Sequence, residues 1–176
     1  GSDELRKEFL APSIAGDLVC SIGVSEPGAG SDVASIKTFA KKDGDDYVIT
    51  GTKMWITSGT QSDWICLLAN TSEGAPHKNK TLICVPMKTK GVQVAKKLKK
   101  IGNHSSDTAE LAFEDMRIPK RYMLGEENMG FMYLMQNFQS ERIIACTSAC
   151  AGAGFMIDEA IAFGRDRVAF GKPIIK

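Results

Sequence analysis

The segment Val24–Asp32 contains the first residues whose types and spacing could do chemistry. It reads Val-Ser-Glu-Pro-Gly-Ala-Gly-Ser-Asp, so two hydroxyl side chains flank two glycines. Exposed backbone N–H groups and hydroxyls in such a loop can bind a phosphate or the polar edge of a planar ring. An ordinary glycine-rich turn explains the same pattern. The loop is not a dinucleotide-fold fingerprint, because no helix-forming pattern follows it.

A second segment, Gly51–Gly59, ends a β-type run with an aromatic side chain and hydroxyl residues. Trp55, Ile56 and Thr57 are consecutive in it. An indole can cover the face of a planar heteroaromatic ligand while a nearby hydroxyl bonds to an edge nitrogen. The simpler alternative is that Trp55 is a core aromatic.

Both segments lie among short β-type runs that extend from Asp17 to about Pro119, with no helical pattern between them. The tetrad Lys42-Asp43-Gly44-Asp45 predicts a hairpin. The runs are Leu18–Val24, Ile36–Ala40, Tyr47–Thr50, Lys53–Thr57, Trp64–Ala69, Thr81–Pro86, Gly91–Val94 and Ala109–Met116. They predict a mainly β fold, an antiparallel barrel or sandwich that forms a middle domain over residues 17–121.

Helical periodicity replaces the β pattern in residues 122–176. No proline occurs from Gly130 to about Arg167, and apolar residues recur there at helical spacing. We expect one long helix, bent near Asn137–Ser140, whose small residues pack against another backbone. Residues 1–16 read as the tail of a preceding helical domain. We therefore expect a fragment with a truncated helical domain at each end.

The charge balance argues against a nucleic-acid partner. Lys and Arg total 22 against 21 for Asp and Glu, which gives a net charge of +1 and no general attraction to polyanions. The lysines between Lys78 and Lys100 have no aromatic residue among them on which bases could stack. We interpret them as a solvated surface.

Cysteine and histidine usage argues against a metal site and a disulfide framework. The five cysteines are odd in number and form no CxxC pair, and the two histidines lack a ligand-like setting. No apolar run approaches the ~20 residues that span a bilayer, so we expect no transmembrane segment.

Five ordered motifs resemble those of the acyl-CoA dehydrogenases. VSEPGAGSD, GTKMWITSG, SSDTAELAFEDMRIP, ERI and RDRVAFGKPI occur in the family's order at similar intervals, within a resemblance that covers Leu5 to Lys176. It looks closest to the long-chain and isovaleryl members. The resemblance implies an FAD-dependent α,β-desaturation of acyl-CoA thioesters in fatty-acid or branched-chain oxidation, with electrons passing to an electron-transferring flavoprotein.

In the first loop, the resemblance implies contacts with both cofactor and substrate. Val24 and Ser25 correspond to residues that hold the flavin pyrimidine edge, and Ser25 replaces the threonine found in several members. Gly30 and Ser31 correspond to positions near the FAD phosphates and the thioester.

Further cofactor contacts are implied in two other segments. Trp55, Ile56 and Thr57 would pack against the isoalloxazine, with the Thr57 hydroxyl near its reactive nitrogen. Arg167 and Phe170 match positions that reach the FAD of a neighbouring subunit. The resemblance therefore implies a homo-oligomer, either a tetramer or a dimer.

Substrate contacts and the catalytic base are implied on the long helix. Phe138 and Arg142 match positions that contact the CoA portion. Glu141 is predicted to be the catalytic base, because in the long-chain and isovaleryl members a glutamate immediately before this arginine has that role. Ser105–Thr108 matches a family segment, but the sequence assigns it no chemical role.

The resemblance leaves two functional alternatives open. One is the acyl-CoA oxidase branch of the family, in which oxygen is the electron acceptor. The other is that the chain by itself is an inactive structural or binding module. The implied location is the mitochondrial matrix, or the cytoplasm if the protein is bacterial.

Overall fold

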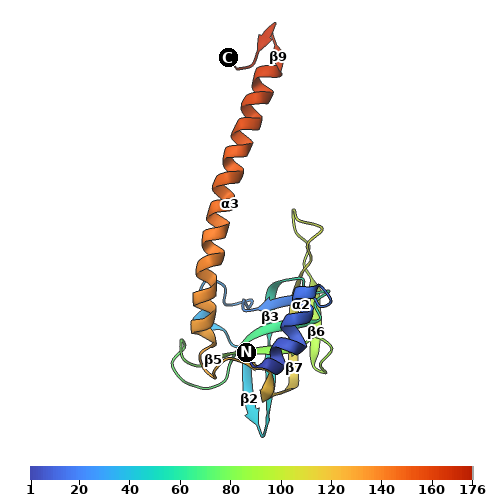
Figure 1. The fold of residues 1–176 in the computed structure, drawn as a ribbon, viewed down its shortest axis with the longest axis vertical. Helices are drawn as coiled ribbons and strands as arrows, with labels where there is room; N and C mark the ends of the chain where they lie inside the picture. The colour runs from blue at the N-terminus through green and yellow to red at the C-terminus, as the bar shows by residue number, and fades with distance from the viewer. Residues whose placement is uncertain (176) are drawn as a thin grey trace. The chain divides into compact units, whose positions relative to one another are not determined.

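The computed structural model describes residues 1–175, which fall into two compact units that divide between Tyr133 and Leu134. The first unit contains a sheet of eight strands (Figure 1). These strands are β1 (Cys20–Gly23), β2 (Phe39–Asp43), β3 (Asp46–Thr57), β4 (Trp64–Asn70), β5 (Lys80–Pro86), β6 (Val92–Lys97), β7 (Thr108–Pro119) and β8 (Met123–Leu124).

The sheet is mixed and open. Its strand order is β6-β7-β3-β2-β4-β5-β8, and β1 pairs with β4 in parallel. Strand β2 meets β4 at one further parallel pair, Phe39 with Asn70. The mainly β fold followed by a helix is therefore confirmed, but the sheet is neither wholly antiparallel nor closed. Periodicity identifies strands and gives no information on which distant strand becomes the partner.

Local turn chemistry explains the hairpin between β2 and β3. Gly44 adopts φ 58°, a left-handed conformation that glycine takes without steric cost, and Asp43 pairs with Asp46 across the turn. The predicted runs Tyr47–Thr50 and Lys53–Thr57 form the single strand β3. The run predicted over Ile36–Ala40 begins later, at Phe39, and the 3-10 turn η2 (Val33–Ser35) precedes it.

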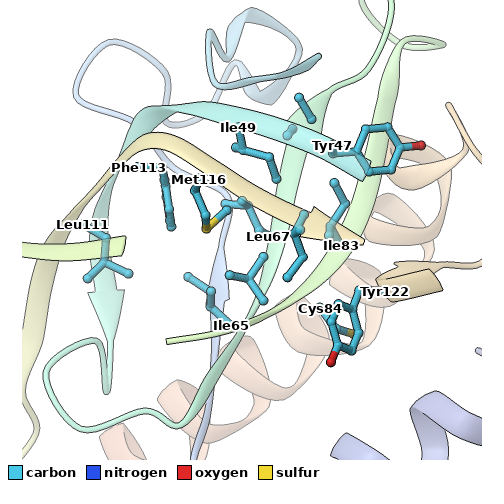
Figure 2. Packing of buried hydrophobic residues seen from close by; sticks show 14 of the residues in the cluster. Tyr47, Ile49, Ile65, Leu67, Ile83, Cys84, Leu111, Phe113, Met116 and Tyr122 are labelled. Carbon is cyan, nitrogen blue, oxygen red and sulfur yellow. The ribbon is translucent and has the colours of Figure 1, made fainter. Parts of the chain in front are cut away.

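The core lies between strands of the first unit. Figure 2 shows side chains of β3, β4, β5 and β7 that point toward one another, whereas Cys84, the neighbour of Ile83 on β5, lies beside Tyr122; the labelled inward ones are Tyr47, Ile49, Ile65, Leu67, Ile83, Leu111, Phe113 and Met116. Alternate residues of each strand face this interior because successive side chains point to opposite faces of a sheet.

The predicted N-terminal helical segment packs on the sheet. It consists of α1 (Asp3–Leu5), a π-helical turn η1 (Arg6–Leu10) and α2 (Ala11–Ala15). The ring of Phe9 lies 5.1 Å from that of Trp64 and 5.4 Å from that of Tyr122, which follows β7 in the 3-10 turn η3 (Lys120–Tyr122). The indole of Trp64 also donates a hydrogen bond of 2.9 Å to Ser13.

The helix α3 (Gly130–Asp166) begins in the first unit, and from Leu134 it forms most of the second. The short strands β9 (Val168–Ala169) and β10 (Lys172–Pro173) follow it. The helix continues without interruption through residues 137–140, where the sequence suggested a bend (Figure 1). By length and composition α3 also meets the criterion for a membrane-spanning helix, with a mean hydropathy of 1.3 over 18 residues. The sequence shows no uninterrupted apolar run of that length, because four charged residues, Glu141, Arg142, Asp158 and Glu159, lie among the apolar residues of α3.

Candidate functional site

An irregularity in β3 determines how the residues Trp55–Thr57 are displayed. Lys53 pairs with Leu111 and Ile56 with Ala109, so Met54 and Trp55 together oppose the single residue Glu110 of β7. This is a β-bulge, and Trp55 within it has φ 64°. A positive φ is unusual for a bulky residue, and such outliers gather at functional sites.

The bulge turns Trp55 outward. Its side chain is 60% exposed, while the neighbouring Ile56 is buried and Thr57 is exposed. The interpretation of Trp55 as a core aromatic is therefore wrong. The bulge also allows Lys53 and Ile56 to face the interior together although they are three residues apart. An exposed indole with an exposed hydroxyl two residues further on is suited to a flat ligand.

The loop that begins at Val24 is fastened directly to this bulge. The amide of Met54 donates a hydrogen bond of 2.8 Å to the Ser25 carbonyl, so Ser25 and Trp55 lie on adjoining segments. Val24 is buried, whereas Gly30 and Ser31 are exposed. Within residues 1–175 the amide and hydroxyl of Ser25 have no hydrogen-bond partner, so both are available to a ligand.

A buried ion pair beneath the loop was missed by the sequence analysis. The ammonium of Lys53 lies 2.9 Å from a carboxylate oxygen of Glu26, and both side chains are almost wholly enclosed. Burial lowers the pKa of Lys53 to about 8, although Glu26 opposes this shift. Burial also opposes ionisation of Glu26, but Lys53 and hydrogen bonds from Thr38 and Lys37 outweigh it and lower that pKa. We interpret the pair as ionised at neutral pH.

Asp107 fastens the turn that follows the bulge. Its carboxylate accepts hydrogen bonds from the Thr60 amide at 2.8 Å, the Thr60 hydroxyl at 2.7 Å and the Gln61 side chain at 2.6 Å. Its backbone carbonyl accepts a further bond from the Ser58 amide. These contacts give the segment Ser105–Thr108 a structural role that the sequence alone did not assign.

A hollow of about 290 Å³ lies beside Thr57. Its lining consists of Cys20, Ser21, Ile22, Thr57, Ser58, Trp64 and Cys66. Burial raises the pKa of the Cys66 thiol to about 12, so it stays protonated and contributes an apolar wall. The first unit thus combines an exposed aromatic, an unpaired serine and a lined hollow around the end of β3.

The predicted substrate residues lie together on one stretch of α3. The Arg142 guanidinium is 5.9 Å from the centre of the Phe138 ring, at the outer limit of a cation–π contact. Glu141 is exposed and accepts a hydrogen bond of 3.1 Å from the Asn137 side chain. An exposed carboxylate next to an aromatic and a guanidinium can receive a proton from a bound ligand.

Arg167 and Phe170 belong to the turn at the end of the second unit. The Arg167 amide donates to Phe163 at 2.8 Å, and its carbonyl accepts from Ile174 at 3.0 Å. The intervening Phe170 is fully exposed and has φ 52°. An aromatic held outward in a left-handed conformation is available for contact with another molecule.

Neither unit contains a group of three or more His, Cys, Asp or Glu residues arranged to hold a metal ion, within the part of the chain that the structure describes. All five cysteines are free thiols.

Comparison with known families gives two matches that together cover most of the chain. Residues 21–116 match the model for the acyl-CoA dehydrogenase middle domain, and residues 128–176 match the model for the acyl-CoA dehydrogenase C-terminal domain. The first match contains the bulge, the loop and Asp107. The second contains α3, which met the length and composition criterion for a membrane span.

Individual relatives agree with these matches. The mitochondrial long-chain specific acyl-CoA dehydrogenase of Sus scrofa is 42% identical, over 99% of this chain and 41% of its own length. The mitochondrial short-chain specific enzyme of Bos taurus is 38% identical, over 100% of this chain and 43% of its own length. A crystal structure of a probable acyl-CoA dehydrogenase from Mycobacterium abscessus superposes with a TM-score of 0.95 at 41% identity, covering 99% of this chain and 46% of that one. The chain spans about two fifths of the length of these curated relatives.

Proposed function

The chain belongs to the acyl-CoA dehydrogenase family, and on that premise we propose that it is part of a longer FAD-dependent enzyme that desaturates acyl-CoA thioesters. The observation that carries this proposal is the junction between the Ser25 loop and the Trp55 bulge. It joins an exposed aromatic face to an unpaired hydroxyl and amide, within the region that matches the family's middle domain.

The residues around the bulge fit the flavin of FAD. Trp55 would support the flat ring system with its exposed side chain, and Ile56, whose side chain is buried, would contribute only backbone contacts. Thr57 would offer a hydroxyl to one edge of the ring system. Val24 and Ser25 would meet the pyrimidine edge, whose donors and acceptors need polar partners of the kind that Ser25 provides. Gly30 and Ser31 are exposed as contacts with the phosphates or the thioester require. Bound FAD would supply the two-electron acceptor.

On α3, we assign Glu141 the role of base and Phe138 and Arg142 the binding of the CoA portion. Glu141 would take a proton from the carbon α to the thioester carbonyl, and a hydride would leave the β carbon. The electron pair of the broken Cα–H bond would form the new carbon–carbon double bond. General-base catalysis of this kind requires a carboxylate within hydrogen-bond reach of the α carbon in the assembled site.

We further propose that Arg167 and Phe170 contact FAD bound to a second subunit, so that the enzyme is a homo-oligomer. Electron-transferring flavoprotein would receive the electrons. The names of the curated relatives support a mitochondrial location, whereas the mycobacterial structure fits a bacterial cytoplasm. Both long-chain and short-chain relatives match at nearly equal identity, so the acyl chain length is left open.

In the longer protein, the proposed domain boundaries are residues 1–16 for the end of an N-terminal helical domain, 17–121 for the middle β-domain and 122–176 for the start of the C-terminal one. The relatives' greater length supports a longer protein, since the chain covers 41% and 43% of two of them.

Anaerobic mixing of the longer, flavin-containing protein with acyl-CoAs of different chain lengths tests the proposal. Bleaching of the flavin absorbance, with formation of a 2-enoyl-CoA, is the expected result. A protein that contains no flavin, or whose flavin is not reduced by any acyl-CoA, would contradict it. Rapid oxygen consumption during turnover would instead assign the protein to the oxidase branch.

A further inference from the structure

Lys53 is an unusual residue for its place in β3. Its side chain is completely buried, in a strand whose other inward side chains include Tyr47, Ile49 and Ile56. Burying a charged group costs several kcal/mol unless partners compensate for the lost water. The contacts that Lys53 makes therefore indicate why a lysine occupies this buried position.

Within residues 1–175, the Lys53 ammonium makes its polar contacts only with the start of the Val24–Asp32 loop. It donates 2.9 Å hydrogen bonds to the Val24 carbonyl and to the Glu26 carboxylate. The same carboxylate accepts bonds from the backbone amides of Lys37, at 2.6 Å, and Thr38, at 3.0 Å. One ion pair thus ties β3 to the start of the loop that bears Ser25, Gly30 and Ser31, and to the Lys37–Thr38 segment that follows the 3-10 turn after it.

These bonds also fix the direction of the Ser25 backbone. The carbonyls of Val24, Ser25 and Glu26 are occupied by Lys53, by the Met54 amide and by the Ala29 amide respectively. With three consecutive carbonyls held inside the fold, the amide and hydroxyl of Ser25 are left for a ligand.

Stability alone is a poor explanation for this arrangement. A buried ion pair is seldom more stabilising than apolar residues of similar volume, whereas its hydrogen bonds hold a loop in one orientation. We propose that Lys53 and Glu26 are positioning residues, which act through the Val24–Glu26 backbone to hold Ser25 against the edge of the flavin. This inference rests on the proposed function, because it assumes that the loop binds FAD.

A double substitution separates positioning from stability. Lys53→Met alone leaves Glu26 buried without its partner, so it lowers both the melting temperature and the affinity for FAD. Adding Glu26→Gln removes the uncompensated charge, and the melting temperature should return close to the wild-type value. Because the Val24 carbonyl has still lost its donor, we expect FAD affinity to remain at least tenfold weaker, with a shifted flavin absorption spectrum.

The measurement is a fluorescence titration of the longer apoprotein with FAD, run beside thermal melts. Lys90→Met is the matched control: Lys90 is exposed, and both properties should stay at the wild-type level. Glu26→Asp is a second test. It retains the charge but withdraws the carboxylate by one methylene from the Lys37 and Thr38 amides, and should weaken FAD binding severalfold without unfolding the protein.

The outcomes distinguish this inference from the function on which it rests. If the wild-type protein takes up no FAD, the proposed function fails and the inference fails with it. If the wild type binds FAD, but the double variant and Glu26→Asp bind it within twofold of the wild type with unchanged spectra, the pair is only structural and the inference alone is overturned.

Discussion

Two residues of β3, Lys53 and Trp55, reverse the expectation set by their chemical type. The charged side chain is wholly buried and the large aromatic is 60% exposed. From residue type alone, lysine is expected at the surface and tryptophan inside, so type alone would misplace both, whereas the family resemblance implied that Trp55 faces a ligand. One signal was present: Lys53 has the same alternation parity as Tyr47 and Ile49, which face the core. The bulge that exposes Trp55 has no comparable signature.

The ion pair predicts a pH dependence of stability. The folded-state pKa of Glu26 is lowered below its ordinary 4.5, so its stabilising contribution is complete above pH 4.5 and is lost as the pH falls through the folded-state value. At pH 7, Glu26→Gln should cost roughly 3 kcal/mol because it leaves Lys53 buried without a charged partner. Urea unfolding of the wild type and of Glu26→Gln should be measured from pH 7 to 3. The difference between their free energies of unfolding should shrink below pH 4.5. A difference that is constant over this range would contradict the assignment.

Glu141, the proposed base, can be tested by a single substitution. In the longer enzyme, Glu141→Gln should leave acyl-CoA binding nearly unchanged, since Phe138 and Arg142 remain. Flavin reduction should slow by roughly 100- to 10,000-fold, because the α-proton loses its acceptor. Stopped-flow absorbance measures both properties. A near wild-type rate of bleaching would assign the base to another carboxylate.

Among the elements of the fold, the end of β3 is connected by hydrogen bonds to two neighbouring segments. The Lys53–Glu26 pair fastens the preceding loop, and Asp107 fastens the turn that follows Thr57. The sequence predicted the hairpin before β3, because Gly44 has a local preference for the required turn. It did not predict the parallel pairing of β1 with β4 or the bulge, because both depend on strands brought together by tertiary contacts.

Removal of the Asp107 contacts should loosen the turn after β3. Asp107→Ala deletes the acceptor of three hydrogen bonds and should lower the free energy of unfolding by about 1 to 2 kcal/mol. It should also speed amide exchange in residues 58–62 relative to β4 and β5. Asp17→Ala, at an exposed aspartate whose side chain makes no hydrogen bond within residues 1–175, is the control. Equal exchange in both variants would show that Asp107 does not hold the turn.

From the exposed apolar side chains of α3 we predict that the chain associates with itself. The exposed side chains of this helix include Ile143, Phe155, Ile157 and Phe163, each at least 60% exposed, and large apolar side chains exposed around a helix favour association in water. Sedimentation equilibrium should detect dimers or larger species that Phe155→Lys weakens. Val94→Lys, at an exposed position on β6, should have no such effect. A concentration-independent monomer would refute the prediction.

For the molecule as a whole, the broad arrangement could be predicted from the sequence more reliably than the geometry of the site. A mainly β region followed by a long helix was predicted from periodicity, and both were found. Five ordered motifs identified the family that the comparisons then matched. The site residues lie in two units, with Ser25 and Trp55–Thr57 in the first and Phe138–Arg142 and Arg167–Phe170 in the second. Each unit offers only part of the proposed contact surface, so the chain alone should bind FAD weakly.

Nuclear magnetic resonance titration of the ¹⁵N-labelled chain with FAD tests the central claim most directly, because it detects weak binding residue by residue. The account predicts saturable shifts of the Trp55 indole N–H and of the Ser25 and Thr57 amides. The Gly44 amide, in the hairpin before the start of β3 and at the opposite end of that strand from the bulge, provides an internal reference that should not move. Shifts confined to other parts of the sheet, or none at these three residues up to the solubility limit of FAD, would contradict the assignment of a flavin site to the β3 bulge.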